Sequence, residues 1–350
     1  MKKGWVKSFS LAMALALVLV GCSNSGNNNN ASGGASGSPE SPAAGGDQTV
    51  IGGAIMNLGW PWYQGAIDGM NNYAAKSGQN LKLQFEDGKF DINTQITQLE
   101  NMAQLGAKGI VVFPVDGKAI IPTMVKLHEQ GVKIVVGDYP QSPDNPEDAV
   151  WETFVGHDFK EMGIAAGEVA VNYLKTLNKD DPTVVYLSVP ASGQASVDRF
   201  EGFSSVVKEA FPNANVIEEG DPKGDRNSAQ TLFENVLQRN KTIDVVSGHN
   251  DALVLGAYNA AVSTNRDKDL RFIGMAGDKE VLQYIQDGNP SWIGEVLQDP
   301  VVLGEVALEA LMASIEGKDL EETTPLPKPE VITPDNVNEY DWQNWSWLGN

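Results

Sequence analysis

The sequence predicts an α/β fold in which two doubly wound parallel sheets form two lobes. After residue 47, short apolar runs rich in β-branched residues alternate with helical stretches for about 250 residues. About 300 residues follow residue 47, a length more typical of two domains than of one. A single closed barrel of eight strand–helix units is the less favoured alternative.

In the first half, four apolar runs bounded by Gly, Pro or Asp predict buried strands. The stretches between and after them have helical spacing; the first places Ala66, Met70 and Tyr73 on one face. In chain order we expect strand 50–56, helix 63–76, strand 81–85, helix 93–105, strand 109–113, helix 119–130 and strand 132–136.

The same alternation continues in the second half, with apolar runs of four to seven residues as strands and longer amphipathic stretches as helices. We expect strands at 183–189, 215–218, 244–247, 271–275 and 291–297. Helices are expected at 158–177, 196–211, 226–239, 251–264, 279–287 and 301–316.

The N-terminus is typical of an export signal. Three lysines within the first seven residues precede the uncharged apolar run 11–20, which is too short to span a bilayer. The run ends before Cys22, the only cysteine, at a position typical of lipid acylation. We therefore expect a signal peptide at 1–21, an acylated Cys22 that anchors the chain to the membrane, and a flexible Asn/Gly/Ser tether at 22–47.

Composition and motifs exclude several classes of function. The formal net charge of −21 argues against nucleic acid as a partner. The sequence contains no nucleophile elbow, no phosphate-binding glycine loop and no His-Glu-x-x-His motif, and it has only three histidines. We therefore expect no enzyme activity, no cofactor and no bound metal. We also expect a monomer.

Candidate binding residues follow the predicted strands, because ligands of doubly wound sheets bind outside the carboxyl ends of the strands. Three aromatic residues, Trp60, Trp62 and Tyr63, follow the first strand. Flat apolar rings beside a few amides and carboxylates suit a sugar. The alternative is that these rings cap the helix and pack on the core. The further candidates at strand ends and nearby turns are Phe113, Asp138, Tyr139, Gln194, Arg199, Asn250 and Gln298.

The order and spacing of several short motifs resemble the ribose-type sugar-binding proteins, the extracytoplasmic subunits of ATP-driven (ABC) sugar importers. The motifs are Trp-Pro-Trp-Tyr at 60–63, Phe-Pro-Val-Asp at 113–116, Val-Gly-Asp at 136–138, Asp-Arg-Phe-Glu-Gly-Phe at 198–203, Asn-Asp-Ala at 250–252 and Gln-Asp-Pro at 298–300.

This resemblance implies the type I periplasmic-binding-protein fold, with two lobes that close on the ligand about a hinge of three crossing segments. It places the N-terminal lobe at 48–155 plus 299–327, and the C-terminal lobe with the tail at 156–298 plus 328–350. It also implies that Trp62 and Tyr63 sandwich the sugar ring, while Asp138, Asn250 and Gln298 bond its hydroxyls.

Two positions depart from the family pattern. A sugar-binding Arg is replaced by Val197, and an Asp after the strand 271–275 is replaced by Ala276. These losses argue against ribose, since unpaired hydroxyls cost about 1–3 kcal/mol each. Trp60 and Phe113 point to a more apolar or differently shaped ligand. The candidates to replace the missing groups are Gln194, Lys223, Arg199 and Asp278; Arg199 could instead pair with an acid near the helix start.

The expected function is therefore a lipid-anchored solute-binding protein that delivers a monosaccharide or polyol to an ABC permease. Two alternatives stay open: a subunit that presents a sugar-like signal, such as a furanone autoinducer, to a membrane sensor or chemoreceptor, and a surface-anchored carbohydrate enzyme. The tail 335–350 carries three tryptophans. It either packs back across the hinge or forms a contact surface.

Overall fold

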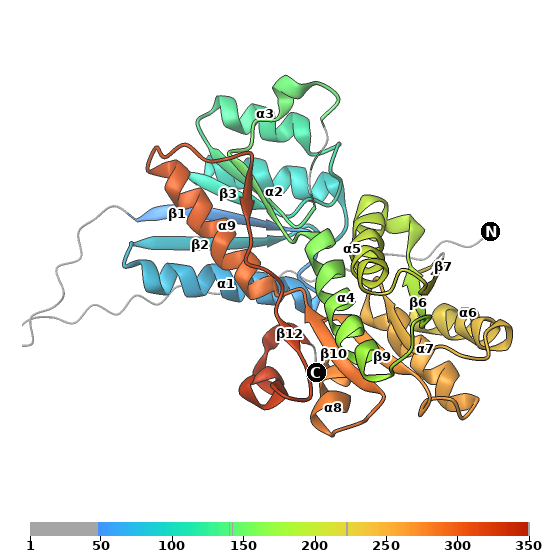
Figure 1. The fold of residues 1–350 in the computed structure, drawn as a ribbon. Coiled ribbons are helices and arrows are strands. Elements are labelled where there is room, and N and C mark those ends of the chain that lie inside the picture. Colours follow the sequence, from blue (N-terminus) through green and yellow to red (C-terminus); the bar gives the residue numbers. More distant parts are fainter. Residues whose placement is uncertain (1–47, 140, 142, 222, 349–350) are drawn as a thin grey trace, which may run out of the picture. The chain divides into compact units, whose positions relative to one another are not determined.

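The computed structural model describes residues 48–139, 141, 143–221 and 223–348 (Figure 1). The expected signal peptide, tether and acylated Cys22 lie outside these residues. No helix in the described part of the chain is both long enough and apolar enough to cross a membrane.

The described chain forms two six-stranded sheets. The first has the order β11-β5-β4-β3-β1-β2, and its neighbouring strands pair in parallel. Its strands are β1 (Thr49–Ile55), β2 (Leu81–Asp87), β3 (Gly109–Val112), β4 (Lys133–Gly137), β5 (Thr153–Gly156) and β11 (Thr323–Pro325). We call this sheet and its helices lobe one.

Lobe two is built on the sheet of order β12-β10-β9-β8-β6-β7. Its strands are β6 (Thr183–Ser188), β7 (Asn215–Gly220), β8 (Val245–Gly248), β9 (Arg271–Ala276), β10 (Trp292–Leu297) and β12 (Val331–Ile332). The edge strand β12 pairs antiparallel with β10, whereas the other pairs are parallel. The chain therefore passes between the two sheets three times: after β5, after β10 and after β11.

Helices cover both faces of each sheet. In lobe one, α1 (Pro61–Ser77) and α9 (Pro300–Ile315) cover one face, and α2 (Ile92–Gln104) and α3 (Ile121–Glu129) cover the other (Figure 1). Successive residues of β3 alternate between them: Val111 packs with α1 and α9, and Ile110 with α2 and α3. This is the side-chain period of a strand that is buried on both faces.

Lobe two repeats this arrangement. One face carries α4 (Phe159–Thr176) and α5 (Gln194–Ala210), and the other carries α6 (Arg226–Arg239), α7 (Asp251–Ser263) and α8 (Lys279–Gln286). In β6, Val184 and Tyr186 pack with α4 and α5, whereas Val185 and Leu187 face the other helices.

The predicted fold class is confirmed, and the single-barrel alternative is wrong because the strands form two separate sheets. Every expected helix and strand is present, with shifts of a few residues at the ends; α1, for example, begins at Pro61. Three short strands were missed: β5, β11 and β12, each of two to four residues. They are too short to show the alternation of apolar and polar side chains that marks a strand, and only their pairing with an adjacent strand defines them.

Candidate functional site

The candidate site lies where the strands of both sheets end and the next helices begin. In lobe one, β1 leads through a short loop into α1, whose first residue is Pro61, a residue suited to the first helical position. This start places Trp62 and Tyr63 in the first turn of α1, after the loop that follows the strand end. Asp138 and Tyr139 follow the end of β4.

Aromatic rings form one wall of the site in lobe one. Trp60 is 52% exposed and stacks on Tyr63, with ring centroids 6.3 Å apart and planes at 9°. The rings of Phe90 and Trp60 meet in a T-shaped contact, with their centroids 4.7 Å apart. Beneath them, the buried Phe113 meets Tyr63 edge-on at 5.6 Å. Tyr63 thus belongs to the core, as the packing alternative proposed for the three aromatic residues, and so does Phe113, while Trp60 presents an aromatic surface to solvent.

A buried carboxylate adjoins this wall. The Tyr63 hydroxyl donates a hydrogen bond of 3.0 Å to Oδ2 of Asp138. Asp138 has a positive φ of 76°, a backbone conformation in which Asp is enriched, and its amide donates to the carbonyl of Val155. Burial raises the pKa of Asp138 to about 6, although the Tyr63 bond and the charge of Arg199 favour the ionised form. The side chain can therefore accept hydrogen bonds from a ligand above that pH.

Arg199 supplies the positive charge of the site. It is 3% exposed, and its guanidinium lies 4.8 Å from the ring centroid of Phe159, at the start of α4. Its Nη1 donates to the carbonyl of His249 at 2.6 Å, and its Nη2 to Oε1 of Gln298 at 2.8 Å. Its buried Nε has no hydrogen-bond partner among the described residues. Arg199 therefore bonds a backbone carbonyl and an amide, rather than an acid near the helix start.

Gln298 links the two lobes at the second crossing. Its backbone carbonyl accepts a hydrogen bond of 3.1 Å from Nε1 of Trp62, in lobe one, while its side chain accepts from Arg199, in lobe two. Trp62 is half-buried and meets Tyr63 edge-on at 5.1 Å. The structure thus brings together four predicted residues, Trp62, Tyr63, Gln298 and Arg199.

Two histidines near Arg199 are neutral at physiological pH. Burial and the Arg199 charge lower the pKa of His249 to about 3 and that of His157 to about 4. Nδ1 of His249 and Nε2 of His157 are buried without a hydrogen-bond partner in the described structure. Neither is ready to act as a base, because a catalytic base needs a pKa near the working pH.

A pair of buried acids supports the loop after β9. One carboxylate oxygen of Asp251 accepts from the amide of Met275 at 2.7 Å, and the other from Gly277 at 2.9 Å and Asp278 at 2.8 Å. Glu295, fully buried in β10, accepts from the same Gly277 amide at 2.6 Å. Burial and the Asp251 charge raise the pKa of Glu295 well above its usual range, so Glu295 is the protonated partner.

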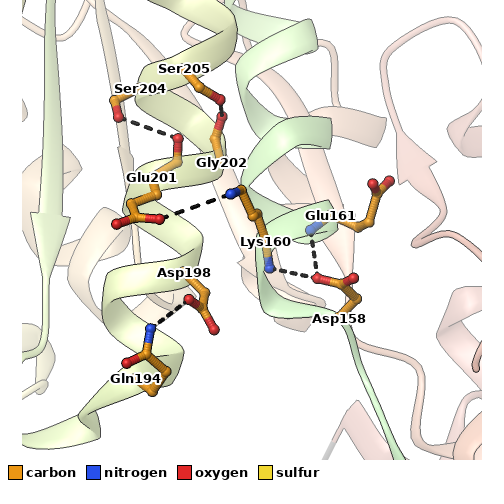
Figure 2. A network of polar contacts seen from close by, with 9 residues as sticks. All are labelled: Asp158, Lys160, Glu161, Gln194, Asp198, Glu201, Gly202, Ser204 and Ser205. Carbon is orange, nitrogen blue, oxygen red and sulfur yellow. Dashed lines mark hydrogen bonds and ion pairs between the residues drawn. The ribbon is translucent and has the colours of Figure 1, made fainter. Parts of the chain in front are cut away.

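The remaining predicted residues lie apart from this hydrogen-bonded group. Asn250 caps α7, since its side-chain oxygen accepts from the amide of Leu253 at 3.0 Å. Tyr139 is 46% exposed, and its ring centroid lies 6.0 Å from that of Phe159. Figure 2 shows the exposed Gln194 at the start of α5, where its amide donates to Asp198 one turn later at 2.7 Å.

The substitutes considered for the missing family residues have mostly local roles. Asp278 caps α8 by accepting from the amide of Glu280, and the backbone of Lys223 bonds Asp221. At the two positions that depart from the family pattern, Val197 is 46% exposed and Ala276 has a positive φ of 119°. Of the four candidates, Arg199 alone is seen in the buried hydrogen-bonded group.

Sequence reasoning missed Phe159, Met162, Asp251 and Glu295. The first two contact the guanidinium of Arg199 from α4, and their helix-start positions carry no signal for that role. Glu295 did carry one: it is a lone acid inside an otherwise apolar strand, and such a residue needs a partner. No group of three or more His, Cys, Asp or Glu that could hold a metal occurs among the residues described.

Comparison with known proteins identifies similar chains. A family described as periplasmic binding protein domain matches residues 51–319. The ribose import binding protein RbsB of Bacillus subtilis is 27% identical over 278 residues, which cover 79% of this chain and 85% of that protein. The xylitol-binding protein of Mycolicibacterium smegmatis is 24% identical over 273 residues, which cover 77% of this chain and 73% of that protein.

Among solved structures, an ABC transporter solute-binding protein from Bacillus halodurans with bound myo-inositol is similar, with a TM-score of 0.64 and 25% identity. The match covers 84% of this chain and 97% of that one.

Proposed function

The chain belongs to the periplasmic binding protein domain family, a family of binding proteins rather than enzymes, and from this premise we propose that it captures a monosaccharide or polyol for an ABC importer. It would act outside the cytoplasm as the solute-binding subunit. Relatives named for ribose and for xylitol, and a similar structure that holds myo-inositol, support this class of ligand.

The observation that supports the proposal is the presence of a buried acceptor, a buried donor and aromatic rings at the strand ends of the two lobes. Asp138 offers a carboxylate, Arg199 has an unpartnered Nε, and Trp60 presents an exposed ring stacked on Tyr63. Asp138 and Arg199 influence each other's pKa, so they lie within electrostatic reach across the two lobes. A neutral, hydroxylated molecule with an apolar face fits such a set of groups.

Several finer features belong to the same proposal. The ligand would be held between lobe one (48–155 plus 299–327) and lobe two (156–298 plus 328–350) and would shift them toward a closed state. An acylated Cys22 would keep the protein at the outer face of the membrane. With Val197 and Ala276 at positions that bear polar groups in the family, we expect the preferred ligand to be a molecule other than ribose.

A thermal-shift screen of the purified protein tests this proposal. The panel contains D-ribose, other pentoses and hexoses, xylitol and myo-inositol, with amino acids and furanones as controls of other chemistry. A ligand at a hundred times its Kd adds about 2.7 kcal/mol to the stability of the folded state. This corresponds to a rise in melting temperature of several degrees.

We expect such a rise with at least one sugar or polyol, and a smaller one with ribose than with the preferred ligand. A rise with an amino acid alone would reject the ligand class and keep the fold. A furanone response without any sugar response would favour the sensor alternative.

A further inference from the structure

The C-terminal tail, Thr333–Leu348, contacts both lobes. After β12 it forms three short 3-10 turns, η3 (Val337–Glu339), η4 (Trp342–Asn344) and η5 (Ser346–Leu348), drawn in red near α8 in Figure 1. In lobe two, Gln343 donates a hydrogen bond of 2.7 Å to Gln286 of α8. In lobe one, Ser346 donates to the carboxylate of Asp68 on α1. The tail thus bridges the lobes in addition to the three chain crossings.

Trp347 is wedged between the two lobes. It is 6% exposed, and it fills the space beside one glycine from each lobe. A Cβ built on Gly65 of α1 would lie 2.8 Å from Cβ and 2.9 Å from Cδ1 of Trp347. A Cβ built on Gly277, after β9, would lie 2.6 Å from Cη2 and 2.9 Å from Cζ3. One edge of the indole therefore touches α1, and the opposite edge touches the loop of lobe two.

Both contact points adjoin the walls of the candidate site. Gly65 lies two residues after Tyr63 on the same helix, and Trp62 packs against the apolar cluster of lobe two that contains Trp347. Gly277 directly follows Ala276, and its amide is the one held by Asp251 and Glu295. A movement of Trp347 would therefore act on the aromatic wall and on the loop after β9 together.

We propose that the tail is a strap between the lobes and that Trp347 is a positioning residue that sets the angle between the lobes. The proposal rests on the proposed function, because it assumes that ligand binds between the lobes. In the arrangement described, Asp138 follows β4 of lobe one and Arg199 lies on α5 of lobe two, and the strap stabilises that arrangement. Without the wedge, the lobes would sample a wider range of angles, and the binding-competent fraction would fall.

The test measures the distance between the lobes in the absence of ligand. Nitroxide labels at K82C in lobe one and K208C in lobe two, in a C22S background, report this distance by double electron–electron resonance. The variants are Trp347→Ala, the conservative Trp347→Phe, and Trp342→Phe as a control. Trp342 is a buried tail tryptophan of the same apolar cluster, in the preceding turn. If Trp347→Ala does not fold, Trp347→Phe and Ser346→Ala take its place.

We expect a broader distance distribution for Trp347→Ala, a partial return with Trp347→Phe and no change with Trp342→Phe. Titrations with xylitol, myo-inositol and D-ribose should show about a tenfold loss of affinity for whichever of them binds the wild type. If Trp347→Ala lowers the melting temperature but leaves the distance distribution unchanged, Trp347 only stabilises the core, and the proposal is overturned. Absence of binding by the wild type would count against the proposed function alone, since the distance measurement needs no ligand.

Discussion

Asp138 is the residue whose charge matters most for the proposed ligand. Its carboxylate is desolvated, accepts from Tyr63 and lies within the field of Arg199, and its pKa is raised to about 6. Protonation turns one oxygen from an acceptor into a donor. The neighbouring Arg199 stays charged, and His157 and His249, with pKa values of about 4 and 3, stay neutral above pH 5. Asp138 is therefore the group in direct contact with Tyr63 that titrates between pH 5 and 7.5.

We predict that affinity for the sugar or polyol falls about tenfold from pH 7.5 to pH 5, since only about one Asp138 in ten remains ionised one pH unit below its pKa. Isothermal titration calorimetry at both pH values measures the change. Asp138→Asn keeps an acceptor for Tyr63 but cannot ionise, so its affinity should be lower and nearly independent of pH. An equally steep pH dependence in the variant would assign the effect to another group.

Asn250 combines a structural role with a proposed binding role, and two substitutions separate them. Loss of the α7 cap in Asn250→Ala should cost about 1 kcal/mol of stability. Asn250→Asp keeps the capping oxygen but removes the amide donor. We therefore expect Asn250→Asp to retain the melting temperature while binding at least tenfold more weakly, about 1.4 kcal/mol. Wild-type affinity in Asn250→Asp would show that the side chain only caps the helix.

At the scale of elements, Asp251 and Glu295 join the start of α7, the end of β9 and the middle of β10. Both acids have raised pKa values: burial is the largest cause in each, and the value for Asp251 is about 6. The folded state therefore keeps a proton that the unfolded state releases above its ordinary carboxyl pKa. Stability from this source is present at low pH and is lost as the pH rises through the folded-state pKa.

We predict that Glu295→Gln, which keeps an acceptor for Gly277 and a donor for Asp251, gains stability relative to wild type as the pH rises from 5 to 8. Thermal unfolding at pH 5, 6.5 and 8 gives the difference in melting temperature at each pH. The two buried histidines have lowered pKa values and act in the opposite direction, below pH 6.5, but they are common to both proteins and cancel. A difference that is constant with pH would contradict the prediction.

Most elements were predictable because strand and helix periods are local properties of the sequence. The four-residue core of β3 and the amphipathic α2 are examples, and each is recognisable from fewer than fifteen residues. The short strands β11 and β12 were not predictable, because a neighbour from a distant part of the chain defines each of them.

In the candidate site, too, local sequence patterns were predictable and contacts between distant residues were not. The strand-end rule selects Tyr63 and Asp138, which the structure places in contact. It cannot reveal that Glu295 meets Asp251, 44 positions earlier, or that Arg199 bonds Gln298, because only the completed fold brings these residues together. The position of Trp347 was left open for the same reason, and the structure places it between the lobes.

At the scale of the whole molecule, each lobe is built from segments that are far apart in the sequence. The strands β1 to β5 of lobe one come from residues 49–156, but α9, which buries Leu303 and Leu308 against them, begins only at residue 300. Lobe two in turn receives β12 and the tail after the chain has returned from lobe one. The two lobes are thus distinct in space and interleaved in sequence.

This interleaving affects how the protein can fold while it is being synthesised. A ribosome that has made the first 250 residues has supplied five strands of lobe one but not the helix that completes its apolar core. Contacts of such long sequence separation also form slowly, because the loop-closure entropy must be overcome first. Neither lobe can therefore complete its apolar core until synthesis is almost finished. The signal peptide expected from the sequence would export the chain before it folds, and such a delay would favour that export.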